Sequence, residues 1–141
     1  MALVSARATV DAVQVLTLLV ASYLYALCQA LDLRAMQVEF EAGLRVAVQD
    51  KLAAHLGPHL SAAELDELYP LVWCALVSEL ERTSTKDVSQ RMQIASTATL
   101  PPIVEFCAKH GALAVLEDVI RFRDDVATLG TEQMTELRQA Y

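Results

Sequence analysis

Apolar residues recur with a helical period through most of the chain. They are spaced three, four or seven positions apart, and no stretch alternates apolar and polar residues as an exposed strand does. Pro and Gly are absent from residues 3–42, and the pattern continues past Gly43 to His55. It therefore predicts one long helix over about residues 9–55, with Thr9 or Asp11 as its N-cap. Its apolar stripe contains Val13, Leu16, Val20, Leu24, Leu27, Leu31 and Val38.

The segment "GPHLSAAELDEL" predicts the end of this helix and the start of a second one. Gly57 can take the left-handed conformation of a helix C-terminus, and Pro58 cannot continue the helix. Ser61 and Glu64 have the spacing of a capping box. The second helix then carries an apolar stripe and a Pro at position 70, which predicts a kink or a two-piece helix. The stripe contains Leu65, Leu68, Val72, Leu76 and Leu80.

Four further helical segments follow. Ser84 or Thr85 is the expected N-cap of a helix that carries Val88, Met92 and Ala95. Pro101 and Pro102 are expected at the start of the segment "PIVEFCAK", which should end at Gly111, with His110 as its cap. In the last part, Gly130 is expected to end one helix and Thr131 to cap another, and the apolar side contains Leu113, Leu116, Ile120 and Phe122.

These patterns predict an all-α protein. We expect a helical bundle in a single domain, residues 1–141, built on the long N-terminal helix and packed by four or five shorter helices. Hydrophobic residues make up 55% of the sequence, which is more than a domain of this size usually contains. The excess apolar surface requires either lipid or a subunit interface.

Charge and cysteine content narrow the class of protein. The net charge is −7 without any cluster of Lys or Arg, which argues against nucleic acid and against an anionic membrane surface. The sequence contains an odd number of cysteines, Cys28, Cys74 and Cys107. They lie far apart, each within an apolar helical pattern. They predict buried, reduced thiols and a cytoplasmic protein.

Residues 12–31 carry no charge, and about 20 apolar residues are enough to cross a bilayer as a helix. Thr17, Ser22 and Gln29 dilute this segment, and no basic cluster flanks it. The same helical phase also continues into charged turns. We therefore expect no membrane span, and instead a homo-oligomer, a dimer or a tetramer, formed through the long helix.

The first forty residues also carry a family resemblance. The segments "ALVSARAT" and "YLYALCQALDLRAMQVEF" resemble the C-terminal helical region of the aromatic amino-acid ammonia-lyases and aminomutases, the phenylalanine ammonia-lyase group. Weaker similarity continues in "LERTSTKDVSQRM". The resemblance covers most of this chain but only the final portion of such an enzyme.

The resemblance implies a tetrameric assembly, whereas the absence of a family motif argues against ammonia-lyase activity. Members of the family form a methylidene-imidazolone electrophile from an internal Ala-Ser-Gly, and they are homotetramers whose long helices pack in a central bundle. This sequence has no Ala-Ser-Gly: Tyr23 follows Ala21-Ser22, and Thr97 follows Ala95-Ser96. No catalytic residue of the family has a matching position, so we expect no ammonia-lyase activity from this chain alone and no cofactor.

Polar groups on the long helix are the candidates for a chemistry of its own. Tyr23 and Asp32 could act as general acid and base, and Tyr25, Gln29, Arg34 and Trp73 could bind a substrate. A structural role competes with this interpretation: Asp32 and Arg34 would form an ion pair, and the tyrosines and Trp73 would pack in the core.

A metal site is not expected. His55 and His59 have a spacing that suits zinc only on an intact helix, and Gly57-Pro58 should break that helix, which favours a solvent-facing loop. The sequence also contains no phosphate-binding glycine loop.

Two functions remain open at this point. The chain could be a repurposed small enzyme that binds and converts an apolar or aromatic metabolite by cyclisation, isomerisation or elimination, in a pocket between helices or subunits. Alternatively, it could be a non-catalytic subunit or scaffold that completes a separately encoded N-terminal half of an ammonia-lyase.

Overall fold

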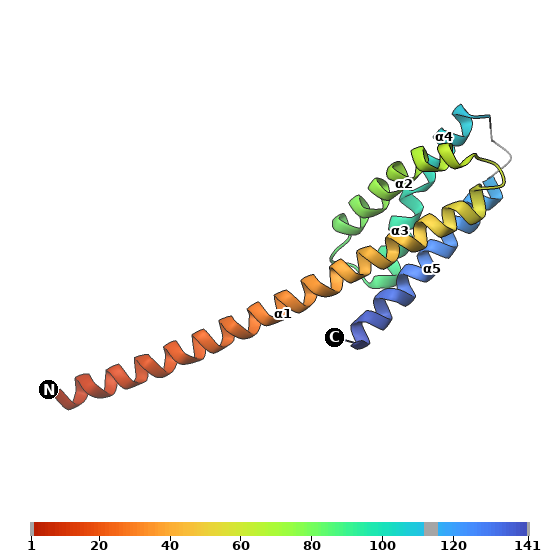
Figure 1. Cartoon of the computed structure of the whole chain (residues 1–141). Helices are drawn as coiled ribbons and strands as arrows, with labels where there is room; N and C mark the ends of the chain where they lie inside the picture. Colours follow the sequence, from red (N-terminus) through yellow and green to blue (C-terminus); the bar gives the residue numbers. More distant parts are fainter. Residues whose placement is uncertain (1, 112–115, 141) are drawn as a thin grey trace. The chain divides into compact units, whose positions relative to one another are not determined.

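The computed structural model describes residues 2–111 and 116–140, with side chains from residue 6 onward, and these residues are almost all helical. The helices are α1 (Ala2–Leu56), α2 (Ala62–Arg82), α3 (Val88–Ala98), α4 (Leu100–Lys109) and α5 (Leu116–Ala140) (Figure 1). The prediction of an all-α protein with one long helix and four or five shorter helices is thus confirmed. The prediction of a single domain stays a prediction.

Contacts divide the chain into two units, Met1–Val38 and Glu39–Tyr141. We call the first the N-terminal helical unit and the second the bundle, and describe each by itself. Helix α1 contributes to both, and it begins seven residues before the predicted start, without the expected caps at Thr9 or Asp11. Residues 2–8 contain no Pro or Gly, so nothing in the local sequence stops the helix there.

The core of the bundle is built from ladders of buried residues four positions apart. Such residues lie on one face of a helix, one turn after another. On the last part of α1 they are Phe40, Leu44, Val48, Leu52 and Leu56; on α2 they are Leu68, Val72, Leu76 and Leu80. The α2 ladder matches the predicted stripe, except that Leu65 at its start is half-buried.

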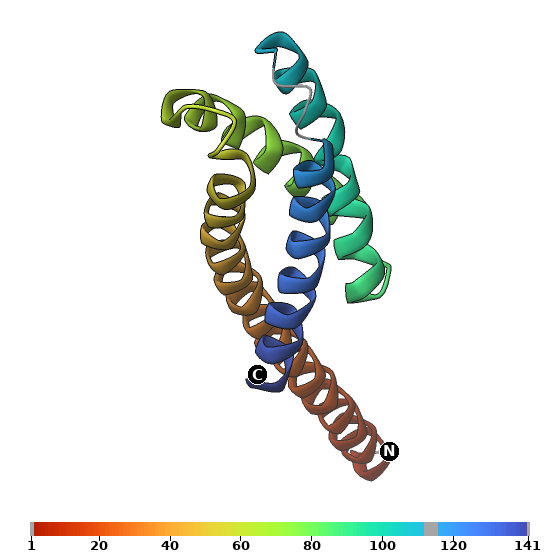
Figure 2. The ribbon, with the colours of Figure 1, turned by 90° about the vertical axis from the view of Figure 1, so that its right-hand side faces the viewer.

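Helices α3 and α5 complete this core. Within the bundle, α3 contacts both α2 and α5, while α4 contacts α2 and α5. The last part of α1 lies alongside α5, as Figure 2 shows, and an ion pair between Lys51 and Asp125 at 2.8 Å joins them. The buried residues of α5 are Val119, Phe122, Val126, Gly130 and Met134.

The boundary between α1 and α2 agrees with the prediction except at Gly57. Ser61 is the N-cap of α2, and both hydrogen bonds of its capping box with Glu64 are present. Pro70 lies inside α2, which remains a single helix. Gly57 does not adopt the left-handed conformation: within the described residues that conformation is found only at Gly111, after α4. The Gly57 amide instead donates to the Ala53 carbonyl at 3.0 Å, so the last turn of α1 closes as a helix.

Two predicted boundaries are wrong. The N-cap of α3 is Asp87 rather than Ser84 or Thr85, because residues 83–86 form a turn after α2. Helix α5 continues through Gly130 to Ala140, so Gly130 ends no helix and Thr131 caps none. Glycine is needed at position 130 for a steric reason and not to end a helix. A Cβ there would clash with Met92, so the glycine allows α5 and α3 to approach closely.

The predicted apolar side of α5 is also wrong. Leu116 and Ile120 are 60% and 40% exposed, whereas Phe122 is fully buried as expected. Leu113 lies outside the described residues. The buried face follows Val119, Phe122 and Val126, which are three and four positions apart and continue to Gly130.

Candidate functional site: an exposed apolar helix

The N-terminal helical unit exposes nearly all of its described apolar side chains. Between residues 6 and 38 every described residue is exposed except one half-buried position, Met36. An apolar helix of this kind is normally covered by protein or by lipid. The exposed large side chains are Val10, Val13, Val15, Leu16, Leu18, Leu19, Val20, Tyr23, Leu24, Tyr25, Leu27, Leu31, Leu33 and Val38.

These apolar side chains point in all directions around the helix. Successive residues of an α-helix are rotated by about 100°, so residues nine positions apart lie on opposite faces. Leu27 belongs to the predicted stripe, and Leu18, nine positions earlier, is 69% exposed on the opposite face. One neighbouring helix covers one stripe, so it would leave the other face in water.

The polar side chains of this segment are satisfied within the helix itself. Thr17 Oγ1 donates to the Val13 carbonyl at 2.8 Å, and Ser22 Oγ donates to the Leu18 carbonyl at 2.8 Å. A buried hydroxyl is costly without a hydrogen-bond partner. These two hydroxyls therefore keep their hydrogen bonds when the helix is covered.

The length and composition of α1 are compatible with a covering of either protein or lipid. Helix α1 is the one helix of the described residues that is long and apolar enough to cross a membrane. A helix at a protein interface meets the same criterion, so the finding is weak support for a span.

The structure places the predicted site residues on two faces of α1. Gln29 Nε2 donates to Tyr25 Oη at 2.9 Å, and Asp32 lies seven positions after Tyr25, on the same face. Tyr23 and Arg34 lie on the opposite face, since Tyr23 and Asp32 are nine positions apart. The predicted acid–base pair, Tyr23 and Asp32, is therefore divided between two faces of one helix.

The described contacts also differ from the competing structural interpretation of these residues. Tyr23 and Tyr25 are both 66% exposed. Within the described residues no ion pair joins Asp32 and Arg34, because side chains two positions apart on a helix point away from each other.

Trp73 lies apart from these residues, on α2 in the bundle. It is half-buried rather than in the core. The guanidinium carbon of Arg45 lies 5.4 Å from the centroid of its ring, and the Tyr69 ring stacks at 6.3 Å. Trp73 thus covers the surface where α1 and α2 meet, in a cation–π arrangement.

The histidines bind carboxylates and a helix end. His55 Nε2 lies 3.0 Å from Asp125 Oδ2, and His59 Nε2 lies 2.9 Å from Asp118 Oδ2. The two rings are thus held by different carboxylates on α5. His110 is the C-cap of α4, as predicted. Within the described residues, no group of three His, Cys, Asp or Glu side chains could hold a metal.

The expectation of three buried thiols is wrong for two of them. Cys107 is buried, and this burial raises the pKa of its thiol. Cys28 and Cys74 are exposed. Cys74 lies two positions from both Val72 and Leu76, so it points away from the buried face of α2.

Comparison with known proteins finds relatives among the phenylalanine ammonia-lyases. It is 37% identical over 146 residues to a phenylalanine ammonia-lyase of Strobilurus tenacellus and 38% identical over 148 residues to phenylalanine ammonia-lyase 1 of Pleurotus ostreatus. Both alignments cover 100% of this chain and 20% of the relative. The chain is thus similar over its whole length to one part of these phenylalanine ammonia-lyases.

Other comparisons define the limits of this relationship. A phenylalanine ammonia-lyase of Agaricus bisporus is 72% identical over 40 residues, which are 28% of this chain. No family model matches the chain, and no solved structure matches it. The chain spans about a fifth of the length of the curated relatives that match all of it.

Proposed function

We propose that the chain is a non-catalytic assembly module of an ammonia-lyase-like protein. In this role, residues 6–38 of α1 pack against helices of other copies, and the bundle holds α1 at its C-terminal end. The observation that carries the proposal is the exposed apolar surface on opposite faces of this helix. Covering both faces requires more than one neighbouring helix, which favours a tetramer over a dimer.

The same surface also suits a second partner, an ammonia-lyase-like N-terminal subunit. Such a subunit would supply the Ala-Ser-Gly that this sequence lacks. Two free, exposed cysteines fit a reducing compartment, so we place the assembly in the cytoplasm rather than in a membrane.

The proposal is tested by incubating the full chain with phenylalanine and recording absorbance, with and without an N-terminal ammonia-lyase polypeptide that contains Ala-Ser-Gly. We expect no cinnamate from the chain alone and co-elution of the two polypeptides on size exclusion. Cinnamate formation by the chain alone would contradict a non-catalytic role.

A second candidate is the conversion of an apolar or aromatic metabolite. It is favoured by the polar strip formed by Tyr25, Gln29 and Asp32 on an otherwise apolar helix. In an assembly, this strip would lie against a neighbouring helix, where Asp32 could take a proton from a bound substrate. Asp32→Asn should then abolish turnover of the metabolite without changing the oligomeric state, whereas loss of the oligomer would assign the strip to assembly.

A further inference from the structure

A pocket in the bundle lies between residues 39–43 of α1 and the last turns of α5. It includes none of residues 6–38. Its volume is about 380 Å³, within the range of small-molecule sites. We call it the α1–α5 pocket. It is lined by Glu39, Phe40, Gly43, Gln133, Glu136, Leu137 and Ala140.

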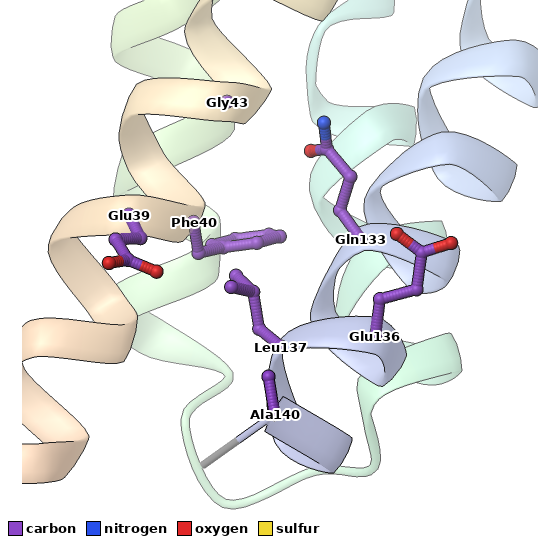
Figure 3. Close-up of a pocket in the computed structure, with 7 residues that line it drawn as sticks. All are labelled: Glu39, Phe40, Gly43, Gln133, Glu136, Leu137 and Ala140. Atoms are coloured by element: carbon purple, nitrogen blue, oxygen red, sulfur yellow. The ribbon is translucent and has the colours of Figure 1, made fainter.

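The apolar part of this pocket comes from both helices. Figure 3 shows the Phe40 ring and the Leu137 side chain pointing toward each other across the space, with Ala140 below Leu137. Gly43 has no side chain, so α1 leaves room beside Phe40. An added Cβ at this position would lie 3.2 Å from Gln133 Nε2.

The polar side chains of this pocket are the carboxylates of Glu39 and Glu136 and the amide of Gln133, which has an Oε1 acceptor and an Nε2 donor. Gln133 Oε1 is a buried atom without a hydrogen-bond partner among the described residues. A buried carbonyl without a partner costs free energy, so a donor from a ligand would be favourable there. Glu136 lies three positions after Gln133 on α5. Its carboxylate forms no ion pair in the described part of the chain.

In the view of Figure 3 the Gln133 and Glu136 side chains rise from the last turns of α5, with the Gln133 amide on the side of α1 and the Glu136 carboxylate on the side away from it. An anionic acceptor and a neutral acceptor carried by α5 at an apolar pocket suit a group that is cationic and carries several N–H donors. A primary ammonium has three such donors. It is also attracted by the face of an aromatic ring such as that of Phe40.

We propose that the α1–α5 pocket binds a small primary amine with an apolar body. The ammonium donates hydrogen bonds to the Glu136 carboxylate and to Gln133 Oε1, and the apolar body packs against Phe40, Leu137 and Ala140. This site is independent of the assembly through residues 6–38, and it uses none of the residues on the polar strip of α1.

The test is isothermal titration of the full chain with 2-phenylethylamine, compared with its neutral analogue 2-phenylethanol and with phenylacetate. We expect saturable binding of the amine, at least about tenfold weaker binding of the alcohol, and no binding of the anion. Equal binding of amine and alcohol, or no saturable binding of the amine, would overturn the proposal.

Three variants locate the site. Glu136→Gln should weaken amine binding by about tenfold, because it replaces a charge-assisted hydrogen bond by a neutral one. Gly43→Leu should block the pocket and abolish binding. Glu132→Gln removes an exposed carboxylate of α5 that does not line the pocket, and it should leave binding unchanged.

The fluorescence of Trp73, the single Trp of the chain, reports whether each variant keeps the bundle folded. A folded Gly43→Leu variant that still binds the amine, or a loss of binding in Glu132→Gln as large as in Glu136→Gln, would place the amine elsewhere and contradict the assignment.

Discussion

Individual contacts between α1 and α5 hold the bundle together at its polar edge. Asp125 accepts hydrogen bonds from Lys51 at 2.8 Å and from His55 at 3.0 Å. The hydrogen bonds from Lys51 and His55 lower the pKa of the Asp125 carboxyl below its usual value. Its side chain is 41% exposed, so water screens much of the interaction.

The Asp125→Asn variant should lower the free energy of unfolding by less than about 1 kcal/mol at neutral pH. The pKa of Asp125 is lower in the folded state than in the unfolded state. Its contribution is therefore complete above the unfolded pKa of about 4, and it is lost as the pH falls through the folded pKa. Urea unfolding at fixed protein concentration, between pH 6 and pH 2, should show the difference from wild type shrinking with acidity.

The matched control for this prediction is Asp124→Asn. Asp124 pairs with its neighbour Arg123, and its side chain is 61% exposed, so the change should be smaller. A deficit of Asp125→Asn that grows as the pH falls would contradict the assigned role of Asp125.

Gly130 lies where α5 packs against α3, so a methyl group there would meet a buried side chain. The added Cβ would meet the side chain of Met92, with Sδ at 2.9 Å, and would lie 3.4 Å from Leu44 Cδ1. Ala is about 1 kcal/mol better than Gly in a helix interior, whereas overpacking a core costs about 1–3 kcal/mol. Gly130→Ala should therefore destabilise the bundle by up to about 2 kcal/mol in urea unfolding.

Gly43→Ala is the control for this effect, because the nearest atoms to its Cβ belong to the end of the Gln133 side chain. This variant should be neutral or up to about 1 kcal/mol more stable. Gly130→Ala at least as stable as Gly43→Ala would contradict the packing role of Gly130.

At the scale of the helices, the capping box of α2 is a well-defined local signal. Ser61 Oγ accepts from the Glu64 amide, and the Ser61 amide donates to Glu64 Oε2 at 2.7 Å. Ser61→Ala should cost about 1 kcal/mol of stability. The hydrogen bonds from Ser61 also lower the pKa of the Glu64 carboxyl, so NMR titration should show that pKa rising in the variant. An unchanged pKa would contradict this assignment.

The second prediction for a helix concerns the two faces of residues 6–38. Leu27→Lys changes the predicted stripe and Leu18→Lys changes the opposite face. Since both faces are expected to be covered, each substitution should weaken association. Val46→Lys is the control, because Val46 is 58% exposed on the part of α1 that belongs to the bundle. A Leu18→Lys variant that associates like wild type would indicate a single covered face.

The helices and their caps could be predicted from the sequence where one signal dominated. The four-residue ladder of α2 and the Ser61–Glu64 box are examples. Gly130 was misleading because glycine both ends helices and allows close packing, and the local sequence does not distinguish these roles. In residues 12–31 nearly every position is apolar, so periodicity could not show which face is covered, although the nine-residue spacing of Tyr23 and Asp32 already placed them on opposite faces of a helix. The α1–α5 pocket combines residues about 90 positions apart, and no local pattern predicts that combination.

At the scale of the whole molecule, a chain homologous to a region of the phenylalanine ammonia-lyases combines a folded bundle with an exposed apolar helix. The bundle buries its apolar ladders by itself. The N-terminal helical unit does not, so its stability depends on what covers it. We assign that covering to other copies of the chain.

Sedimentation velocity of the full chain at micromolar concentration tests this account most directly. We predict a homo-oligomer, with a tetramer favoured because two opposite faces of the helix need neighbours. Combining Leu18→Lys with Leu27→Lys should convert it to a monomer in which Trp73 fluorescence remains that of the folded bundle. A wild-type chain that sediments as a monomer would contradict the assembly role.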